Sequence, residues 1–220
     1  MAAKVVLFDF DGTIADTYNA IAKITNQLSS EFGYKALNEE ELLLLKNLSS
    51  REIVKLSEIS IFKIPFLVRR VRTELSKEIE DLSPISGISS VLFELKNRGY
   101  SLGIVTSNDK ENVEMFLRKN KLDSLFSYIY SSTSIFGKHR VINQAIRSNK
   151  LLKADVIYVG DETRDIRSSR KSNIGIAAVS WGFNSAEILQ EYQPDYLVHH
   201  PRELLKAIDL YHAQPATTAN

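Results

Sequence analysis

The stretch KVVLFDFDGTIADT, from Lys4 to Thr17, decides the fold that the sequence predicts. Its apolar run Val5–Phe8 is typical of a buried strand. The run ends in two carboxylates, Asp9 and Asp11, and Gly-Thr follows at once. Neighbouring carboxylates repel each other and raise each other's pKa unless a cation joins them. The stretch therefore predicts a strand that ends at a site for a cation.

Apolar runs of the same kind alternate with helical patterns along the chain. We interpret as strands the runs Val5–Phe8, Leu102–Val105, Tyr128–Tyr130, Val156–Val159, Ile174–Val179 and Tyr196–Val198. We interpret as helices the stretches Gly87–Arg98, Glu111–Lys119, Val141–Asn149 and Ile166–Lys171. Continuous apolar strands alternating with helices predict an α/β fold with a doubly wound, Rossmann-like parallel sheet. Ligands of such sheets bind beyond the carboxyl ends of the strands.

The alternation stops between Ile14 and Leu82, where we find helical patterns and no strand. These patterns are Tyr18–Phe32, Glu39–Leu45, Arg51–Leu56 and Phe66–Glu80. We interpret the segment as an inserted α-helical cap domain, and Ser83-Pro84 as the hinge by which the chain returns to the core. The predicted division is a core of residues 1–14 and 83–212, a cap of residues 15–82, and a flexible tail of residues 213–220.

The composition excludes several classes of function. Of the 220 residues, 44% are apolar and 25% charged, as in an ordinary globular protein. Because 28 Lys and Arg balance 27 Asp and Glu, we expect neither nucleic-acid nor membrane binding. The chain has no cysteine, which excludes disulfides, thiolate metal sites and a cysteine nucleophile. With no signal peptide or membrane-spanning run, we expect a cytoplasmic protein, monomeric or homodimeric.

Residues that carry chemistry follow the predicted strands. They are Asp9, Asp11 and Thr13 after the first strand, Thr106-Ser107-Asn108 after the second, Lys138 in the loop beyond the third, and Gly160 to Asp165 after the fourth. Carboxylate and carbonyl oxygens suit Mg²⁺, a hard ion that keeps waters for a substrate phosphate. An aspartate that faces such a phosphate can attack it and form an acyl phosphate. A second carboxylate two residues further on can protonate the leaving oxygen and then activate water.

These residues resemble the motifs of the haloacid dehalogenase-like phosphohydrolases, in the same order. Asp9-Phe10-Asp11-Gly12-Thr13 resembles the first motif, Val105 to Asn108 the second, Lys138 the third, and Gly160-Asp161 with Asp165 the fourth. The resemblance implies that Asp9 is the nucleophile and a metal ligand, and that Asp11 is the general acid/base and binds Mg²⁺ through its backbone carbonyl. It implies that Asp161 completes the Mg²⁺ site and that Asp165 either binds the ion through water or orients the groups that bind it. It implies that the phosphoryl group is bound by Gly12, Thr106, Ser107, Asn108 and Lys138.

The position of the helical insert, between the first and second motifs, resembles the phosphoglycolate phosphatase and β-phosphoglucomutase branch of this family. Leu45 to Glu52 is similar to the cap loop that faces the active site in that branch, although Asn47 stands where a glycine is common. In this loop Arg51 is the candidate residue for binding an anionic or hydroxylated group of the substrate. The segment from Trp181 to Glu187 is similar to phosphoglycolate phosphatase-like members. The resemblance thus predicts a small phosphorylated metabolite as substrate, with phosphoglycolate as the leading candidate.

Two other functions stay open at this point. A phosphosugar mutase would use the same nucleophile but return the phosphate to its substrate. A binding module would keep the fold without catalysis, although the complete set of acid, base, metal and phosphate residues argues against it. Single residues also have simpler interpretations: Asp9 and Asp11 fit a strand-end Asx turn, and Arg51 fits a solvated helix surface.

Overall fold

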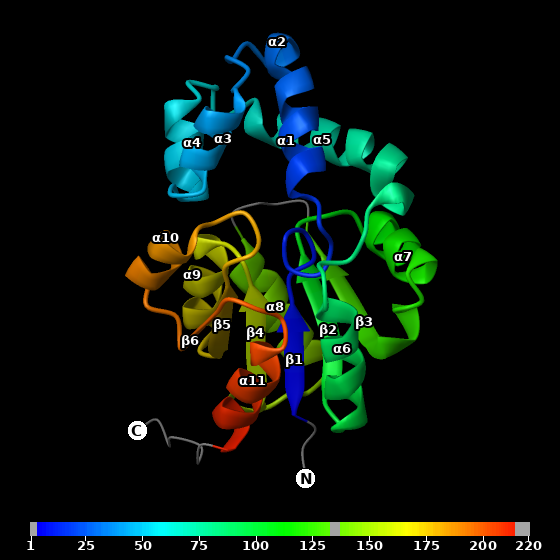
Figure 1. Cartoon of the computed structure of the whole chain (residues 1–220). Coiled ribbons are helices and arrows are strands. Elements are labelled where there is room, and N and C mark those ends of the chain that lie inside the picture. The colour runs from blue at the N-terminus through cyan, green and yellow to red at the C-terminus, as the bar shows by residue number, and fades with distance from the viewer. Residues whose placement is uncertain (1–3, 133–136, 214–220) are drawn as a thin grey trace.

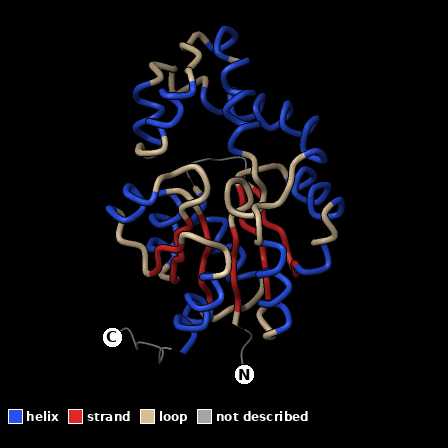
Figure 2. The backbone as a smooth tube through the Cα atoms, viewed as in Figure 1, coloured by secondary structure: helices blue, strands red, loops and turns tan. Residues whose placement is uncertain are grey.

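The computed structural model describes residues 4–132 and 137–213. Its centre is a parallel sheet of six strands in the order β3-β2-β1-β4-β5-β6 (Figures 1 and 2). The strands are β1 (Val5–Phe8), β2 (Ser101–Thr106), β3 (Phe126–Ser131), β4 (Val156–Gly160), β5 (Gly175–Val179) and β6 (Tyr196–Val198). This sheet confirms the predicted α/β class. The predicted tail lies outside the described residues except for Ala213, which ends a helix.

Helices bury both faces of this sheet. On one face lie α6 (Ile88–Asn97), α7 (Lys110–Lys119) and α11 (Glu203–Ala213), and on the other α8 (Lys138–Ser148), α9 (Thr163–Ser172) and α10 (Ala186–Glu191). Strand β1 shows why its run is apolar without interruption. Val6 and Phe8 pack on the first face and Val5 and Leu7 on the second, and all four are fully buried. The 3₁₀ turns η2 (Asp123–Leu125) and η3 (Lys153–Asp155) lead into β3 and β4.

Successive strands are added to the sheet in opposite directions from the junction of β1 and β4: β2 and β3 follow on the side of β1, and β5 and β6 on the side of β4. Phe8 of β1 lies level with Ile104 of β2 on one side and with Val159 of β4 on the other. The chain leaves β1 and β4 toward opposite faces of the sheet, which opens a crevice at their carboxyl ends. The residues that follow these strands therefore meet at one edge.

Beyond this edge lies a layer of helices without a strand (Figures 1 and 2). It contains α1 (Tyr18–Gln27), α2 (Ser29–Phe32), α3 (Glu39–Leu45), α4 (Ser50–Leu56) and α5 (Ile64–Glu78), with η1 (Ile79–Asp81) at its end. The predicted helical insert is confirmed, but the single helix predicted over Tyr18–Phe32 is wrong. The N–H of Leu28 donates to both Ile24 and Thr25, which tightens the turn and separates α1 from α2.

Two paired segments join this helical layer to the sheet. The N–H of Asp16 donates to the carbonyl of Ser83 (3.0 Å), and the N–H of Ile85 donates to that of Ile14 (2.8 Å). The predicted return at Ser83-Pro84 thus lies beside the outgoing chain. The narrow connection is compatible with a cap over residues 15–82, and its independence as a domain stays a prediction.

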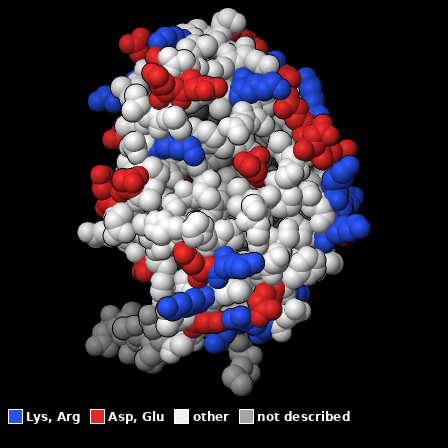
Figure 3. Space-filling model, viewed as in Figure 1, with Lys and Arg blue, Asp and Glu red and all other residues white. Residues whose placement is uncertain are grey.

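The surface carries charges of both signs. Figure 3 shows Lys and Arg interspersed with Asp and Glu around the face in view. Among the described residues, no helix combines the length and the apolar character that a membrane span requires.

Candidate active site

Three carboxylates gather at the carboxyl ends of β1 and β4. Asp9 follows β1, Asp161 follows β4, and Asp165 lies in the first turn of α9. One oxygen from each lies within 4.8 Å of the others, and all three residues are at most 1% exposed. Asp9 and Asp161 are therefore close enough to share a single ion.

Hydrogen bonds and two glycines hold Asp161 in place. Its Oδ1 accepts from the Thr13 hydroxyl (2.6 Å) and its Oδ2 from the N–H of Phe183 (2.7 Å). A Cβ at Gly12 would stand 2.4 Å from Oδ2, and one at Gly182 would stand 2.1 Å from it. Gly12 also has a φ of 72°, which glycine adopts most readily. No role for Gly182 is predicted from the sequence, although it lies in the loop that follows β5, where the strand-end rule applies.

Lys138 bridges two of the carboxylates. Its Nζ donates to Asp9 Oδ2 and to Asp165 Oδ1, and the residue is 4% exposed. Burial lowers the pKa of Lys138, but the charges of Asp165 and Asp9 outweigh burial and the net pKa is raised. The prediction that Lys138 lies in a loop is wrong. Lys138 is the first residue of α8, because this helix begins after Gly137, a turn before its first apolar residue, Val141.

Asp11 occupies a separate position, where Asn108 holds its carboxylate. The Nδ2 of Asn108 donates to Asp11 Oδ1 (3.0 Å) and Oδ2 (3.1 Å). Burial and then the charge of Asp9 raise the pKa of Asp11 to about 7, against an opposing effect of Asn108. A carboxyl group with this pKa can both give and take a proton near neutral pH. The amide of Asn108, which the sequence analysis assigned to phosphate binding, is thus engaged with Asp11.

Two hydroxyls stand at the end of β2. Thr106 Oγ1 accepts from the N–H of Asn108 (3.0 Å), a bond that does not use the hydrogen of its own hydroxyl. Ser107 Oγ accepts from Arg164 Nη2 at 3.4 Å, which links the end of β2 to α9. The residues assigned to the phosphoryl group therefore come from the same sheet edge as Asp9.

Arg164 is a further cation of the site that the sequence analysis did not single out. Its Nε donates to Glu162 Oε1 (2.8 Å). Burial lowers the pKa of Arg164, but the charges of Glu162 and then Asp9 and Asp165 raise it well above its ordinary range. Its position three residues after Asp161, in the first turn of α9, was the available signal.

The described part of this centre holds more acid than base. The acids are Asp9, Asp11, Asp161, Glu162 and Asp165, and the bases are Lys138 and Arg164. Burial first and neighbouring acids next raise the pKa of Asp161 strongly. Burial also raises the pKa of Asp165 to about 6, although Lys138 opposes this. A divalent cation would remove much of the imbalance, and three carboxylates are ligands that a hard divalent cation takes. The donor set fits such an ion.

The helical layer is joined to the core directly above the site. Asn184 Nδ2 donates to the carbonyls of Lys46 (3.2 Å) and Leu48 (3.0 Å), and the N–H of Ser185 donates to that of Lys46 (2.9 Å). Lys46 Nζ in turn donates to the carbonyl of Gly182 (3.0 Å). These bonds hold the loop between α3 and α4 over the loop that follows β5.

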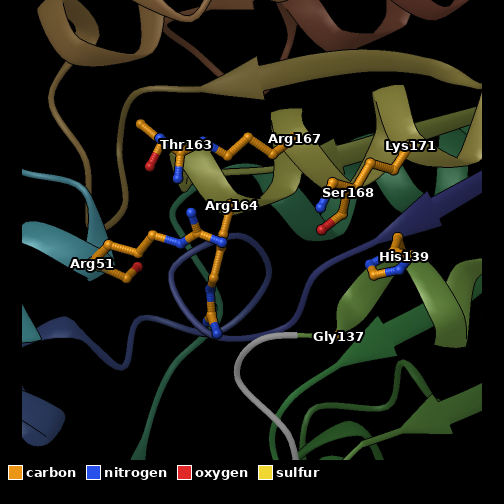
Figure 4. A pocket seen from close by; sticks show the side chains of 9 residues that line it. Arg51, Gly137, His139, Thr163, Arg164, Arg167, Ser168 and Lys171 are labelled. Carbon is orange, nitrogen blue, oxygen red and sulfur yellow. The ribbon is translucent and has the colours of Figure 1, made fainter. Parts of the chain in front are cut away.

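Arg51 projects from α4 toward the core. Arg51 is exposed, and it lines a narrow cavity together with Arg164 and other residues of α9 (Figure 4). The structure thus places Arg51 at the rim of the site, across from α9. A role in substrate binding stays a prediction.

Comparison with known proteins gives one family. The model of the haloacid dehalogenase-like hydrolases matches residues 6–179. The phosphoglycolate phosphatase of Synechococcus elongatus is 36% identical over 205 residues, which are 93% of this chain and 97% of that protein. Pyrophosphatase PpaX of Oceanobacillus iheyensis is 26% identical over 212 residues, covering 94% and 98% of the two chains.

Solved structures of similar chains have the same fold. The haloacid dehalogenase-like family protein SP0104 from Streptococcus pneumoniae aligns with a TM-score of 0.76 at 27% identity, over 93% of this chain and 98% of that one. A predicted phosphatase from Clostridium acetobutylicum aligns with a TM-score of 0.82 at 25% identity, over 96% and 100% of the two chains.

Proposed function

This chain belongs to the haloacid dehalogenase-like hydrolase family and is a phosphatase, and on that premise we propose that it hydrolyses a small phosphate monoester with Mg²⁺ and a phospho-aspartate intermediate. One observation carries the proposal. Asp9, Asp161 and Asp165 lie within 4.8 Å of one another, and Lys138 bridges two of them. The site thus combines a nucleophile, a cation site and a fixed positive charge.

The residues of this chain suggest a two-step reaction. Asp9 attacks phosphorus and the bond to the leaving oxygen breaks, while Asp11 gives that oxygen its proton. Asp11 then takes a proton from water, which attacks phosphorus and releases phosphate and the Asp9 carboxylate. Lys138, Thr106 and Ser107 neutralise or bind the phosphoryl oxygens throughout.

Asp9, Asp161 and the backbone carbonyl of Asp11 would hold Mg²⁺, with Asp165 in support through water. When bound, the ion would neutralise charge on the carboxylates and on the phosphoryl group. Asn108 keeps Asp11 from turning into the carboxylate cluster, since its amide engages both oxygens of Asp11.

Phosphoglycolate is our leading substrate. Its support is the relative named phosphoglycolate phosphatase, which covers nearly the whole chain at 36% identity. We propose a cytoplasmic location, because the proposed substrate is a small metabolite. The mutase alternative differs in product, since it would convert a sugar phosphate into its isomer and release little free phosphate.

The test is the variant Asp9→Asn, assayed with 2-phosphoglycolate and an aryl phosphate in the presence of Mg²⁺. We expect loss of phosphate release with an unchanged circular dichroism spectrum, and loss of the phosphorylated protein species in mass spectra of rapidly quenched reactions. Asp16→Asn, which changes an exposed aspartate of the same stretch, is the matched control. Turnover by Asp9→Asn would remove Asp9 from the role of nucleophile.

A further inference from the structure

A narrow cavity beside the catalytic centre is lined by basic residues. It has a volume of about 80 Å³, and the residues that give it its character are Arg51, His139, Thr163, Arg164, Arg167 and Lys171. No Asp or Glu is among the described residues that line it. A cavity of this size accommodates a small group such as a carboxylate or a phosphate.

The basic side chains reach the cavity from two sides. Arg164, Arg167 and Lys171 lie three and four residues apart on α9, so they share one face of that helix. Arg51 reaches toward them from α4 of the helical layer, and His139 lies toward the other end of the cavity (Figure 4). The cavity therefore forms only where the two layers of the molecule meet.

The charges of this cavity are incompletely compensated within the described residues. Arg164 is paired with Glu162, whereas Arg167 donates to the neutral hydroxyl of Tyr192 (2.5 Å). Among the residues that the structure describes, Arg51, Arg167 and Lys171 form no ion pair with an acid, although the charge of Arg167 also acts on Glu52 of α4. Like charges three or four residues apart on one face of a helix destabilise that helix. An anion in the cavity would reverse this effect.

The cavity adjoins the centre that holds the scissile phosphate. Gly137, on its wall, precedes Lys138, and Arg164 both lines it and donates to Ser107 at the end of β2. We propose that the cavity binds a second anionic group of the substrate, a carboxylate or phosphate joined to the scissile phosphate by a short linker. This rests on the proposed function, because it places the scissile phosphate at Asp9. The preferred substrates are then small molecules with an anionic group at each end.

The test compares substrates that differ only in the second anion. The pairs are 2-phosphoglycolate with ethyl phosphate, and 3-phosphoglycerate with glycerol 3-phosphate. We expect the wild type to prefer the carboxylate in at least one pair. In Lys171→Ala and in Arg167→Gln, that preference in kcat/KM should fall about tenfold, mainly through KM, as for loss of one charged hydrogen bond. Arg170→Ala, an exposed change on the same helix, should leave the preference unchanged.

No preference in the wild type, or a preference that survives both substitutions, would overturn the proposal. Sulfate distinguishes a free anion from the substrate's own group. If sulfate changed the turnover of ethyl phosphate in wild type but not in Lys171→Ala, while the substrate preference stayed intact, the cavity would bind a separate anion and the proposal would be wrong.

Failure of the proposed function is distinguishable from these results. If the wild type hydrolysed none of the four esters, the cavity would be judged by calorimetric titration of inorganic pyrophosphate into Asp9→Asn protein. Adding Lys171→Ala should weaken that binding about tenfold, while adding Arg170→Ala should not. Equal binding by all three proteins would reject the cavity as a subsite.

Discussion

At the scale of single residues, the site depends on groups that fix its carboxylates as much as on the carboxylates themselves. Asp161 is held by the Thr13 hydroxyl and by the N–H of Phe183, and Gly182 leaves room for it. The motifs predict Asp9, Asp161 and Asp165, because ionisable residues at strand ends are visible in a sequence. They do not predict the roles of Gly182 and the Phe183 amide, because the need for a missing Cβ at Gly182 arises from the nearness of Asp161 in the fold, and almost every residue has a backbone N–H.

Thr13→Val tests this support of Asp161. Valine has nearly the shape of threonine but cannot donate to Asp161 Oδ1, a bond of 2.6 Å in the native protein. We expect the apparent affinity for Mg²⁺ to fall by about 10- to 100-fold, as for other groups that orient a metal ligand. Thr13→Ser, which keeps the hydroxyl, should stay near wild type. Activity titrated with Mg²⁺ measures the effect, and equal affinities in the two variants would contradict it.

Asp11 makes a second prediction at this scale. Its pKa is raised from 3.8 to about 7, so the folded protein holds this proton more tightly than the unfolded chain. Stability therefore falls as pH rises from about 4 to about 7 through this group. The side chain in Asp11→Asn cannot ionise. The metal-free variant and the metal-free wild type should therefore have similar free energies of unfolding near pH 4.

Near pH 8 the variant should be more stable, by about 4 kcal/mol, since the pKa of Asp11 is raised by about three units at about 1.4 kcal/mol each. Urea unfolding in EDTA measures this, and activity should fall by about 10²- to 10⁴-fold with the loss of the proton donor. Asp16→Asn, at an exposed position, should show neither effect. A variant that is less stable than wild type near pH 8 would refute the argument.

At the scale of elements, apolar pattern predicts where strands and helices lie, while local backbone geometry sets where they begin. The six strands agree with the predicted positions because each contributes apolar side chains to the packing on at least one face of the sheet. The start of α8 was missed since it depends on Gly137 and not on apolar spacing. The end of α2 follows from Gly33, whose φ of 78° places it in the left-handed region.

Asn184 joins three elements and provides an element-scale prediction. Its Nδ2 donates to Lys46 and Leu48 between α3 and α4, and its Oδ1 accepts from the N–H of Thr163 (2.9 Å), the first residue of α9. Asn184→Ala should raise KM, and lower the free energy of unfolding by about 1–3 kcal/mol because buried partners lose their bonds. Asn47→Ala, which removes one exposed hydrogen bond from the Ser185 hydroxyl to the loop between α3 and α4, should have a smaller effect on both. Equal effects would show that Asn184 has no special part in closing the site.

At the scale of the whole molecule, charge is balanced over the chain but not at its centre. The chain has a net charge of +1, yet among the described residues five acids gather where β1 and β4 end, and the bases that form ion pairs with them are Lys138 and Arg164. A sequence reveals the net charge of the chain and the order of its motifs. The fold and most of the site follow from the motifs. The sequence does not reveal the cavity between α4 and α9, since Arg51 and Lys171 are brought together only by the way the helical layer rests on the core.

This central imbalance predicts how Mg²⁺ and pH act together on stability. The pKa values of Asp11 (about 7), Asp165 (about 6) and Asp161 are all raised, so the metal-free protein loses stability as pH rises through them. Protons compete with Mg²⁺ for the same oxygens, so Mg²⁺ should bind and stabilise more strongly as pH rises.

We therefore expect excess Mg²⁺ to raise Tm clearly at about pH 8, equivalent to about 2–3 kcal/mol at a hundredfold excess over Kd, and much less at about pH 5.5. Thermal unfolding with EDTA or Mg²⁺ at each pH measures the difference. A protein with Asp9→Asn and Asp161→Asn together should lose the response to Mg²⁺, because both ligands are weakened. A Tm shift that is the same at both pH values, or that survives in this variant, would place the ion away from the carboxylates at the ends of β1 and β4.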